Sequence, residues 1–116
     1  MKEASDIFLF GDDVDIEEVQ EGMRRQILGY NQEIMIVKVL FDAGAEGYQH
    51  EHRHSQSTYI ESGVFDVTIG GVTQRLQTGD GFYIPPHVMH GAICVEKGVL
   101  IDTFSPVRED FLEEKK

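Results

Sequence analysis

Several residue types are scarce in this sequence, and each shortage excludes a class of protein. A single cysteine, Cys94, excludes an internal disulfide and fits a reducing compartment, so we expect a cytoplasmic protein. Only 10 basic residues accompany 21 acidic ones, and the formal net charge of -11 disfavours nucleic acid or an anionic membrane as a partner. No apolar run approaches the ~20 residues of a membrane span, and the acidic N-terminus does not resemble a signal peptide.

Glycines divide the chain into short segments rich in β-branched residues. At 116 residues the chain has the usual length of one domain, and we expect a single domain over 1–116 with its core over about 22–112. Short strands with frequent turn residues between them indicate an all-β sandwich or barrel. The expected strands cover residues 23–30, 33–41, 57–62, 64–69, 72–78, 81–84, 91–98 and 99–104.

The turns and the chain ends carry local signals as well. The sequence "IGGV" around Gly70 and Gly71 predicts a two-residue hairpin turn. The acidic segment 11–22 has no strong apolar stripe, so we expect it on the surface with one helical turn. Near the C-terminus, Ser105 followed by Pro106 is typical of an N-cap and first helical residue, which predicts a short helical tail from Pro106.

All five histidines fall in two short stretches, "HEHRH" (50–54) and "HVMH" (87–90). Residues 50, 52, 54 and 56 would share one face of a flat strand. Positions 50 and 56 would nevertheless lie ~20 Å apart at ~3.3 Å per residue, whereas an imidazole ligand lies only ~2.1 Å from its metal. At most two of the three clustered histidines can therefore bind one metal from one strand, with a third ligand from His87 or His90.

The C-terminal sequence "VLIDTFSPVREDF" contains a second group of candidate residues. Asp102 would share a strand face with Leu100 and Phe104, and a carboxylate in apolar surroundings is a candidate general base with a raised pKa. Arg108 could clamp a substrate carboxylate with two hydrogen bonds. It could equally form a surface ion pair with its acidic neighbours, and the sequence leaves both readings open.

The spacing of glycines and histidines resembles the two-motif pattern of the cupin superfamily, G(X)5HXH(X)3,4E(X)6G followed by G(X)5PXG(X)2H(X)3N. The likeness spans residues 44–94 and rests on Gly44, His50, His52, Gln56, Gly63, Gly79, Pro85 and His90. The resemblance implies a jelly-roll barrel, or double-stranded β-helix, with a metal bound by His50, His52, Gln56 and His90.

Three positions depart from the general cupin pattern. Gln56 stands where most cupins have Glu, His87 where they have Gly, and Cys94 where they have Asn. With glutamine as the fourth ligand, the charge of a divalent metal stays uncompensated, which favours Lewis-acid chemistry on an anionic substrate. We expect His54 and His87 to lie at the rim of the barrel without binding the metal, and Cys94 to be a small buried hydrophobe.

A more specific resemblance extends from about residue 22 to residue 112. The segments "ILGY", "HSQSTYIESGVFDVTIGG", "FYIPPHVMHGA" and "GVLIDTFSPVREDFL" are similar to the KdgF family of pectin- and alginate-degradation cupins. This resemblance implies a small cupin, often a homodimer, with one divalent metal that could be Ni, Zn, Fe, Co or Mn. It also implies a reaction site lined by Asp102, Phe104 and Arg108.

The activity implied by this resemblance opens the ring of cyclic 4,5-unsaturated uronates to give linear 5-keto-4-deoxyuronate, so the expected partner is a small anionic sugar. In our hypothesis Asp102 transfers the proton, the metal stabilises the oxyanion, Arg108 binds the uronate carboxylate and Phe104 stacks on the sugar ring. Two alternatives remain. One is a cupin dioxygenase, and the other is a sugar-binding cupin without catalytic activity.

Overall fold

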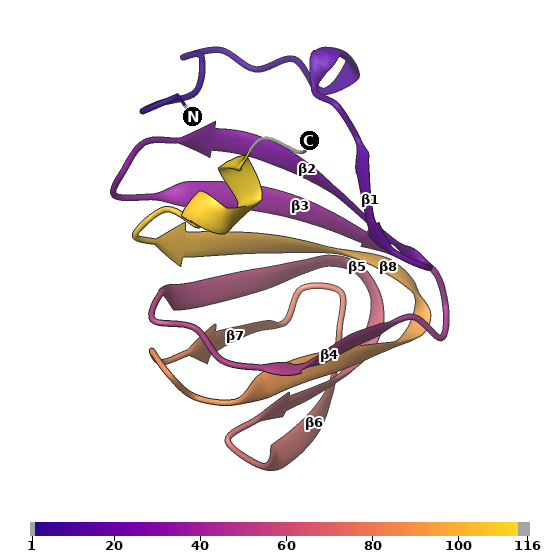
Figure 1. Ribbon diagram of the computed structural model, residues 1–116. Coiled ribbons are helices and arrows are strands. Elements are labelled where there is room, and N and C mark those ends of the chain that lie inside the picture. The colour runs from indigo at the N-terminus through magenta and orange to yellow at the C-terminus, as the bar shows by residue number, and fades with distance from the viewer. Residues whose placement is uncertain (1, 114–116) are drawn as a thin grey trace.

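The computed structural model describes residues 2–113, and in that range the regular secondary structure is almost all β-strand (Figure 1). This confirms the all-β prediction. Two 3-10 helices, η1 and η2, flank the strands near the chain ends. In chain order the elements are η1 (Gly11–Asp13), β1 (Glu17–Gln20), β2 (Met23–Tyr30), β3 (Met35–Phe41), β4 (Glu46–His50), β5 (Ser55–Ile69), β6 (Val72–Gln77), β7 (Gly81–Ile84), β8 (His90–Ser105) and η2 (Glu109–Leu112).

Strands β5 and β8 are the longest strands, and they hold the sheet together. They pair with each other in antiparallel register, and each has two further partners along its other edge. Strands β4 and β3 pair with the first and second parts of β8, while β7 and β6 pair with the first and second parts of β5. Figure 1 shows β5 and β8 curving together, so that the sheet folds over on itself as a jelly-roll barrel does.

A pair of glycines bends these two strands. Gly63 has a φ of 93°, and a Cβ atom on Gly98 would lie only 2.1 Å from the carbonyl oxygen of Ser62. The pairing register shifts at this point, which is typical of a β-bulge. We had expected strands 57–62 and 64–69 to be separate, and likewise 91–98 and 99–104. That division was wrong, because here glycine marks a bend within a strand.

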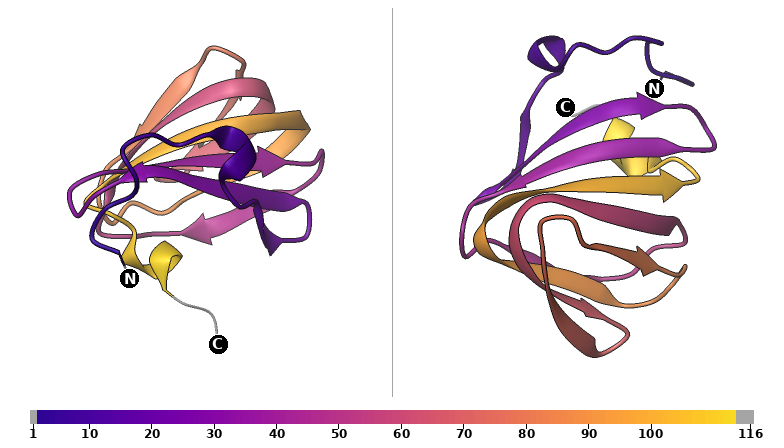
Figure 2. Two further views of the ribbon diagram at one scale, coloured as in Figure 1. Left: turned by 90° about the horizontal axis from the view of Figure 1, so that it is seen from above. Right: turned by 180° about the vertical axis from the view of Figure 1, so that it is seen from behind.

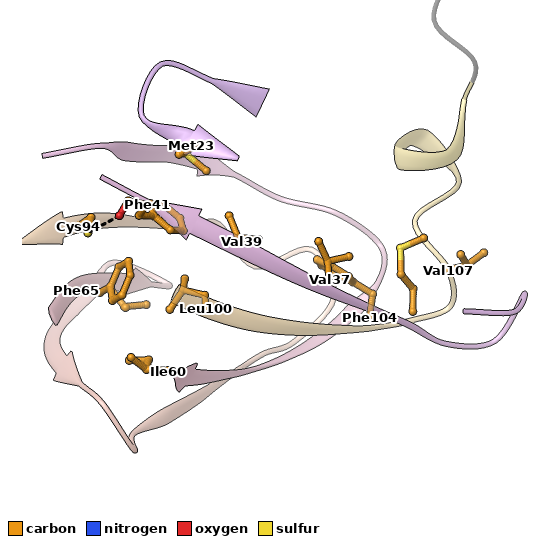
Figure 3. Close-up of a cluster of buried hydrophobic side chains, with 12 residues drawn as sticks. Met23, Val37, Val39, Phe41, Ile60, Phe65, Cys94, Leu100, Phe104 and Val107 are labelled. Carbon is orange, nitrogen blue, oxygen red and sulfur yellow. Dashed lines mark hydrogen bonds between the residues drawn. The ribbon is translucent and has the colours of Figure 1, made fainter. Parts of the chain in front are cut away.

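The interior is filled by side chains that alternate along the central strands. In β3, every second residue from Met35 to Phe41 is buried, the pattern of a strand with one face on the core. Phe41 packs edge-on against Phe65 of β5, with ring centroids 5.1 Å apart. Figure 3 shows this cluster, in which Cys94 is buried as expected.

The segment before β1 runs past β2, while η2 lies close to β2 and β3 and packs Phe111 against the core (Figures 1 and 2). The backbone N–H of Ser5 donates to the carbonyl of Tyr30, which fixes the N-terminal segment along β2. The helical turn expected in segment 11–22 is η1. The expected start of the C-terminal helix at Pro106 is wrong, because β8 continues to Ser105 and η2 begins only at Glu109.

The two-residue hairpin turn predicted at Gly70 and Gly71 is confirmed. It joins β5 to β6, and both glycines have the positive φ that a tight hairpin turn requires. Among residues 2–113, no helix has the length and apolar character needed to cross a membrane.

Candidate metal centre and adjoining cavity

Three histidines from separate parts of the chain come together at one end of the barrel. His50 ends β4 and His90 begins β8, and these two residues face each other in the β4–β8 pairing. His52 follows in the connection to β5. One ring nitrogen from each histidine lies within 4.8 Å of the others, close enough for all three to hold one metal ion.

Backbone carbonyls orient all three imidazole rings. The Nδ1 atoms of His50, His52 and His90 lie 2.9–3.0 Å from the carbonyl oxygens of Tyr48, His54 and Val88 respectively. A carbonyl can only accept a hydrogen bond, so each Nδ1 carries the proton. In the neutral ring, Nε2 then presents its lone pair, and this is how proteins commonly prepare a histidine for metal binding.

Burial keeps two of these rings neutral. It lowers the pKa of His52 and lowers the pKa of His90 to about 4. The Nε2 atom of His90 is buried and has no hydrogen-bond partner. A buried nitrogen lone pair without a donor is costly, and a metal ion at this point would satisfy it.

Gln56, near the start of β5, adds a fourth group that fits a cation. Its Oε1 atom lies 3.0 Å from Nε2 of His52. Because Nδ1 of the neutral His52 ring donates to a carbonyl, Nε2 of that ring carries a lone pair. This lone pair faces a lone pair on Oε1 of Gln56. A cation beside both atoms would remove this repulsion. The donor set of three imidazole nitrogens and one amide oxygen therefore suits a divalent transition metal.

A chain of hydrogen bonds runs from Gln56 to Asp102 across the sheet. The Nε2 group of Gln56 donates to Oγ1 of Thr58 (3.0 Å), and the Thr58 hydroxyl donates to Oδ1 of Asp102 (2.7 Å). Thr58 and Asp102 are directly opposite in the β5–β8 pairing, so their side chains leave the same face. The sequence analysis missed Thr58, although its even spacing from Gln56 along the strand was a usable signal.

A cavity of about 370 Å³ lies inside this end of the barrel. Six of the seven residues singled out from the sequence line it; His52 is the exception. Burial raises the pKa of Asp102 to about 6, against the opposing effects of the Thr58 hydrogen bond, the Arg108 charge and the Gln56 side chain. The cavity therefore combines the histidine group with a carboxylate suited to accepting a proton near neutral pH.

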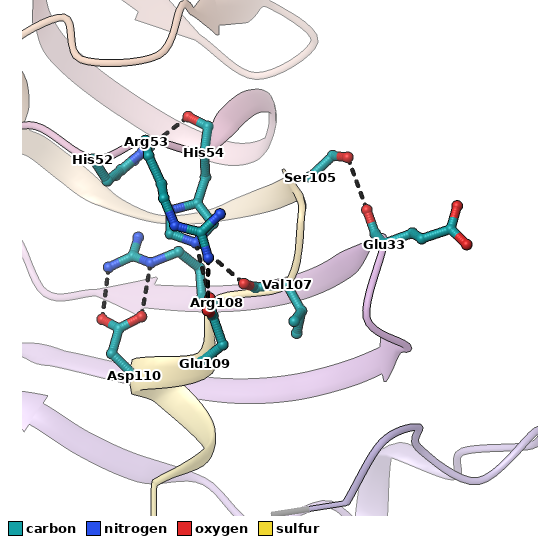
Figure 4. A network of polar contacts seen from close by, with 9 residues as sticks. All are labelled: Glu33, His52, Arg53, His54, Ser105, Val107, Arg108, Glu109 and Asp110. Carbon is teal, nitrogen blue, oxygen red and sulfur yellow. Dashed lines mark hydrogen bonds and ion pairs between the residues drawn. The ribbon is translucent and has the colours of Figure 1, made fainter.

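Two arginines and an aromatic ring form another part of the cavity wall. Arg108 is bonded to Asp110 by Nε and Nη2, at 3.0 and 2.9 Å, yet its side chain is only 11% exposed (Figure 4). Arg108 therefore forms the ion pair with an acidic neighbour that one sequence reading expected; it also lines the cavity, and the clamp on a substrate carboxylate stays a prediction. Arg25 of β2 lies on the ring of Phe111 at 4.0 Å, and Arg108 lies at 4.2 Å from the same ring. Nothing in the sequence pattern indicated Arg25.

The remaining histidines are outside the metal group. His87 is on the surface and has a φ of 64°, the left-handed conformation that suits the glycine expected there from the cupin pattern. The expectation that His54 lies at the rim of the barrel is wrong, because its side chain is buried and only 6% exposed. Its Nε2 atom lies 3.1 Å from the carbonyl oxygen of Val107, next to Arg108 (Figure 4). His54 thus joins the histidine loop to the C-terminal segment.

Comparison with known proteins gives consistent matches over most of the chain. Residues 37–104 match a family described as a cupin domain. The pectin degradation protein KdgF of Dickeya dadantii (strain 3937) is 41% identical over 107 residues, which cover 90% of this chain and 97% of the relative.

Two solved structures are similar over nearly their whole length. An RmlC-like cupin from Shewanella frigidimarina NCIMB 400 is 54% identical, with a TM-score of 0.93 over 95% of this chain and 99% of the other. KdgF from Halomonas sp. is 38% identical, with a TM-score of 0.88 over 92% and 99% of the two chains. The chain therefore belongs to the cupin superfamily and, within it, to the KdgF family.

Proposed function

We propose that this protein is a metal-dependent enzyme that converts cyclic 4,5-unsaturated uronates into linear 5-keto-4-deoxyuronate. One observation carries the proposal. A group of three histidines suited to a metal and a carboxylate with a raised pKa line or adjoin the same cavity. The likeness to pectin degradation protein KdgF supports a sugar substrate of this class. Uronates released from pectin are therefore the first to test, followed by those released from alginate.

Ring opening requires a proton acceptor and a proton donor. Removal of the proton from the anomeric hydroxyl breaks the bond between C1 and the ring oxygen, and C1 becomes an aldehyde. The electron pair remains on the oxygen at C5 as an enolate, which becomes a ketone when C4 takes up a proton. We assign proton removal to Asp102, because its carboxylate lines the cavity and has a pKa near the working range of a general base.

The metal would be held by His50, His52 and His90, with the side-chain oxygen of Gln56 as a fourth ligand. When bound, a divalent ion of this kind supplies positive charge beside the oxygen that gains negative charge. Imidazole ligands suit several transition metals, so Ni, Zn, Fe, Co and Mn all remain candidates.

Arg108 is assigned to the uronate carboxylate. A guanidinium has five N–H donors, and the bidentate pair with Asp110 uses two of them. The remaining donors are available to a ligand in the cavity that Arg108 lines. Arg25 lies on the same wall with its charge paired to Glu17, and Phe104 provides an apolar surface for the sugar ring.

The direct test follows the ultraviolet absorbance of a 4,5-unsaturated uronate. Purified protein is assayed with and without a chelator, after subtraction of the spontaneous rate. Metal-dependent loss of absorbance supports the proposal. No acceleration by folded, metal-loaded protein on either pectin- or alginate-derived substrate refutes it. Oxygen consumption would then indicate the dioxygenase alternative, and substrate binding without turnover would indicate a sugar-binding cupin.

Two further properties belong to the proposal. We propose that the protein is cytoplasmic, as its single cysteine suggests. We also propose a homodimer, because Ile7, Phe8 and Phe10 are 92%, 80% and 68% exposed in the N-terminal segment, which Ser5 joins to β2. A molar mass of one chain by light scattering at micromolar concentration would refute the dimer.

A further inference from the structure

We propose that Thr58 is a positioning residue that turns the Gln56 side chain so that its oxygen, and not its nitrogen, faces the metal. This inference rests on the proposed metal-dependent function and extends it to a residue outside the ligand set. Thr58 is 3% exposed and Gln56 is 7% exposed, so neither has water as a ready substitute partner.

The argument follows the direction of the hydrogen bonds. A threonine hydroxyl has one hydrogen to donate, and here it points to the Asp102 carboxylate at 2.7 Å. The hydroxyl oxygen can then only accept at its other contact, 3.0 Å from the Gln56 side chain. The NH2 group is the donor of a glutamine side chain, so the nitrogen must face Thr58.

The orientation has a direct consequence at the metal. A glutamine side chain is nearly symmetric in shape, and a half-turn about its last bond exchanges oxygen and nitrogen. Only the oxygen has a lone pair for a cation; an amide nitrogen facing the ion would repel it. By holding the nitrogen, Thr58 leaves Oε1 directed at Nε2 of His52, 3.0 Å away. Asp102 sets this order, because it takes the only hydrogen of the hydroxyl.

The test compares metal affinity in two backgrounds. Zn²⁺ and, separately, Ni²⁺ are titrated calorimetrically into metal-free protein without substrate. Thr58→Val keeps the shape of the side chain but removes the hydroxyl, and we expect its affinity to fall about 10- to 100-fold, as for other groups that orient a ligand. Thr58→Ser keeps the hydroxyl and should stay within about threefold of the parent protein on the same reasoning.

The second background is Gln56→Glu. Both ends of a carboxylate are oxygens, so its orientation no longer matters and Thr58→Val should then cost less than about threefold. An equal loss in both backgrounds would show that Thr58 acts through packing and would overturn the inference. Unchanged affinity of Thr58→Val in the Gln56 background would overturn it as well. Thr58→Ala gives the same comparison if the valine variant does not fold.

The titration also separates this inference from the proposed function. If the unmodified protein binds neither metal, the metal-dependent function fails, and the role of Thr58 fails with it. If the unmodified protein binds metal and the Thr58 variants bind equally well, only the inference about Thr58 is lost.

Discussion

Replacing Asp102 by Asn should stabilise the metal-free protein at neutral pH. The same replacement should greatly reduce turnover by the metal-loaded protein. Burial raises the pKa of this carboxyl from 3.8 to about 6, so the ionised form is less stable in the folded state than in water. At about 1.4 kcal/mol per pKa unit, the difference amounts to about 3 kcal/mol. Asparagine carries no charge and keeps an oxygen that can accept the Thr58 hydrogen bond.

The pH dependence follows from the direction of this shift. Because the folded-state pKa is the higher one, the folded protein holds the Asp102 proton between about pH 4 and pH 6, and the unfolded chain has lost it. The free energy of unfolding of the parent protein should therefore decrease over this range relative to Asp102→Asn. The two proteins should be about equally stable below pH 4 and differ by about 3 kcal/mol above pH 6.

The assay is urea unfolding of metal-free protein at a series of pH values, together with turnover of metal-loaded protein at pH 7.5. Asp66→Asn is the control, because Arg75 lowers the pKa of Asp66 at the surface and its removal should bring no gain. Turnover of Asp102→Asn should fall about 10²- to 10⁴-fold, as expected for loss of a general base. Equal stability of the two proteins at pH 7.5 would refute the argument from burial, and full turnover would refute the assignment of the base.

Three other perturbations test separate parts of the structure. Arg108→Lys keeps the charge but loses the planar donors, so KM for the uronate should rise about tenfold with a smaller change in kcat; an unchanged KM contradicts the carboxylate role. A net charge of -11 repels an anionic sugar, so kcat/KM should increase between about 0.01 and 0.15 M salt as the repulsion is screened; a decrease would show that the local positive wall dominates. Gly98→Ala would place Cβ 2.1 Å from the Ser62 carbonyl oxygen, and we expect a loss of about 3 kcal/mol in urea unfolding. Gly11→Ala meets no atom within 4 Å and serves as its control, so equal stability of the two variants would refute the steric argument.

The sequence was most informative where a recurrent motif or the alternation of side chains along a strand determines geometry. The likeness to the cupin pattern predicted His50, His52 and His90 as one group, where the residue spacing by itself left His87 and His90 open, and the fold brings those three histidines together. Strand parity placed Asp102 on one face with Leu100 and Phe104, which agrees with the pairing of β8. The histidine group and the face of Asp102 depend on short segments or on a recurrent motif, so they can be predicted without knowledge of the tertiary structure.

Other features depend on contacts between distant segments. In the sequence we interpreted Gly63 and Gly98 as strand ends, because glycine usually weakens a strand. Only the close approach of the two glycines to each other in the fold shows that they form a bend. Arg25 reaches the cavity by stacking on Phe111, which lies far from it in sequence. His54 looked like a neighbour of the ligands with no partner, but it bonds the backbone at Val107. No local pattern encodes such pairs.

The division of the site between strands and connecting segments bears on how the protein could be altered. Gln56, Thr58, Asp102 and Phe104 belong to the two long paired strands, where a shift of one residue would turn every side chain to the opposite face. His52, by contrast, lies in the short connection between β4 and β5. Of the four proposed ligands only His52 lies outside a strand, so a change in the connection between β4 and β5 could move His52 while the pairing of the strands keeps His50, Gln56 and His90 in place. Asp102, Thr58 and the three ligands in strands all belong to the barrel wall, so they would have to be kept together in any redesign.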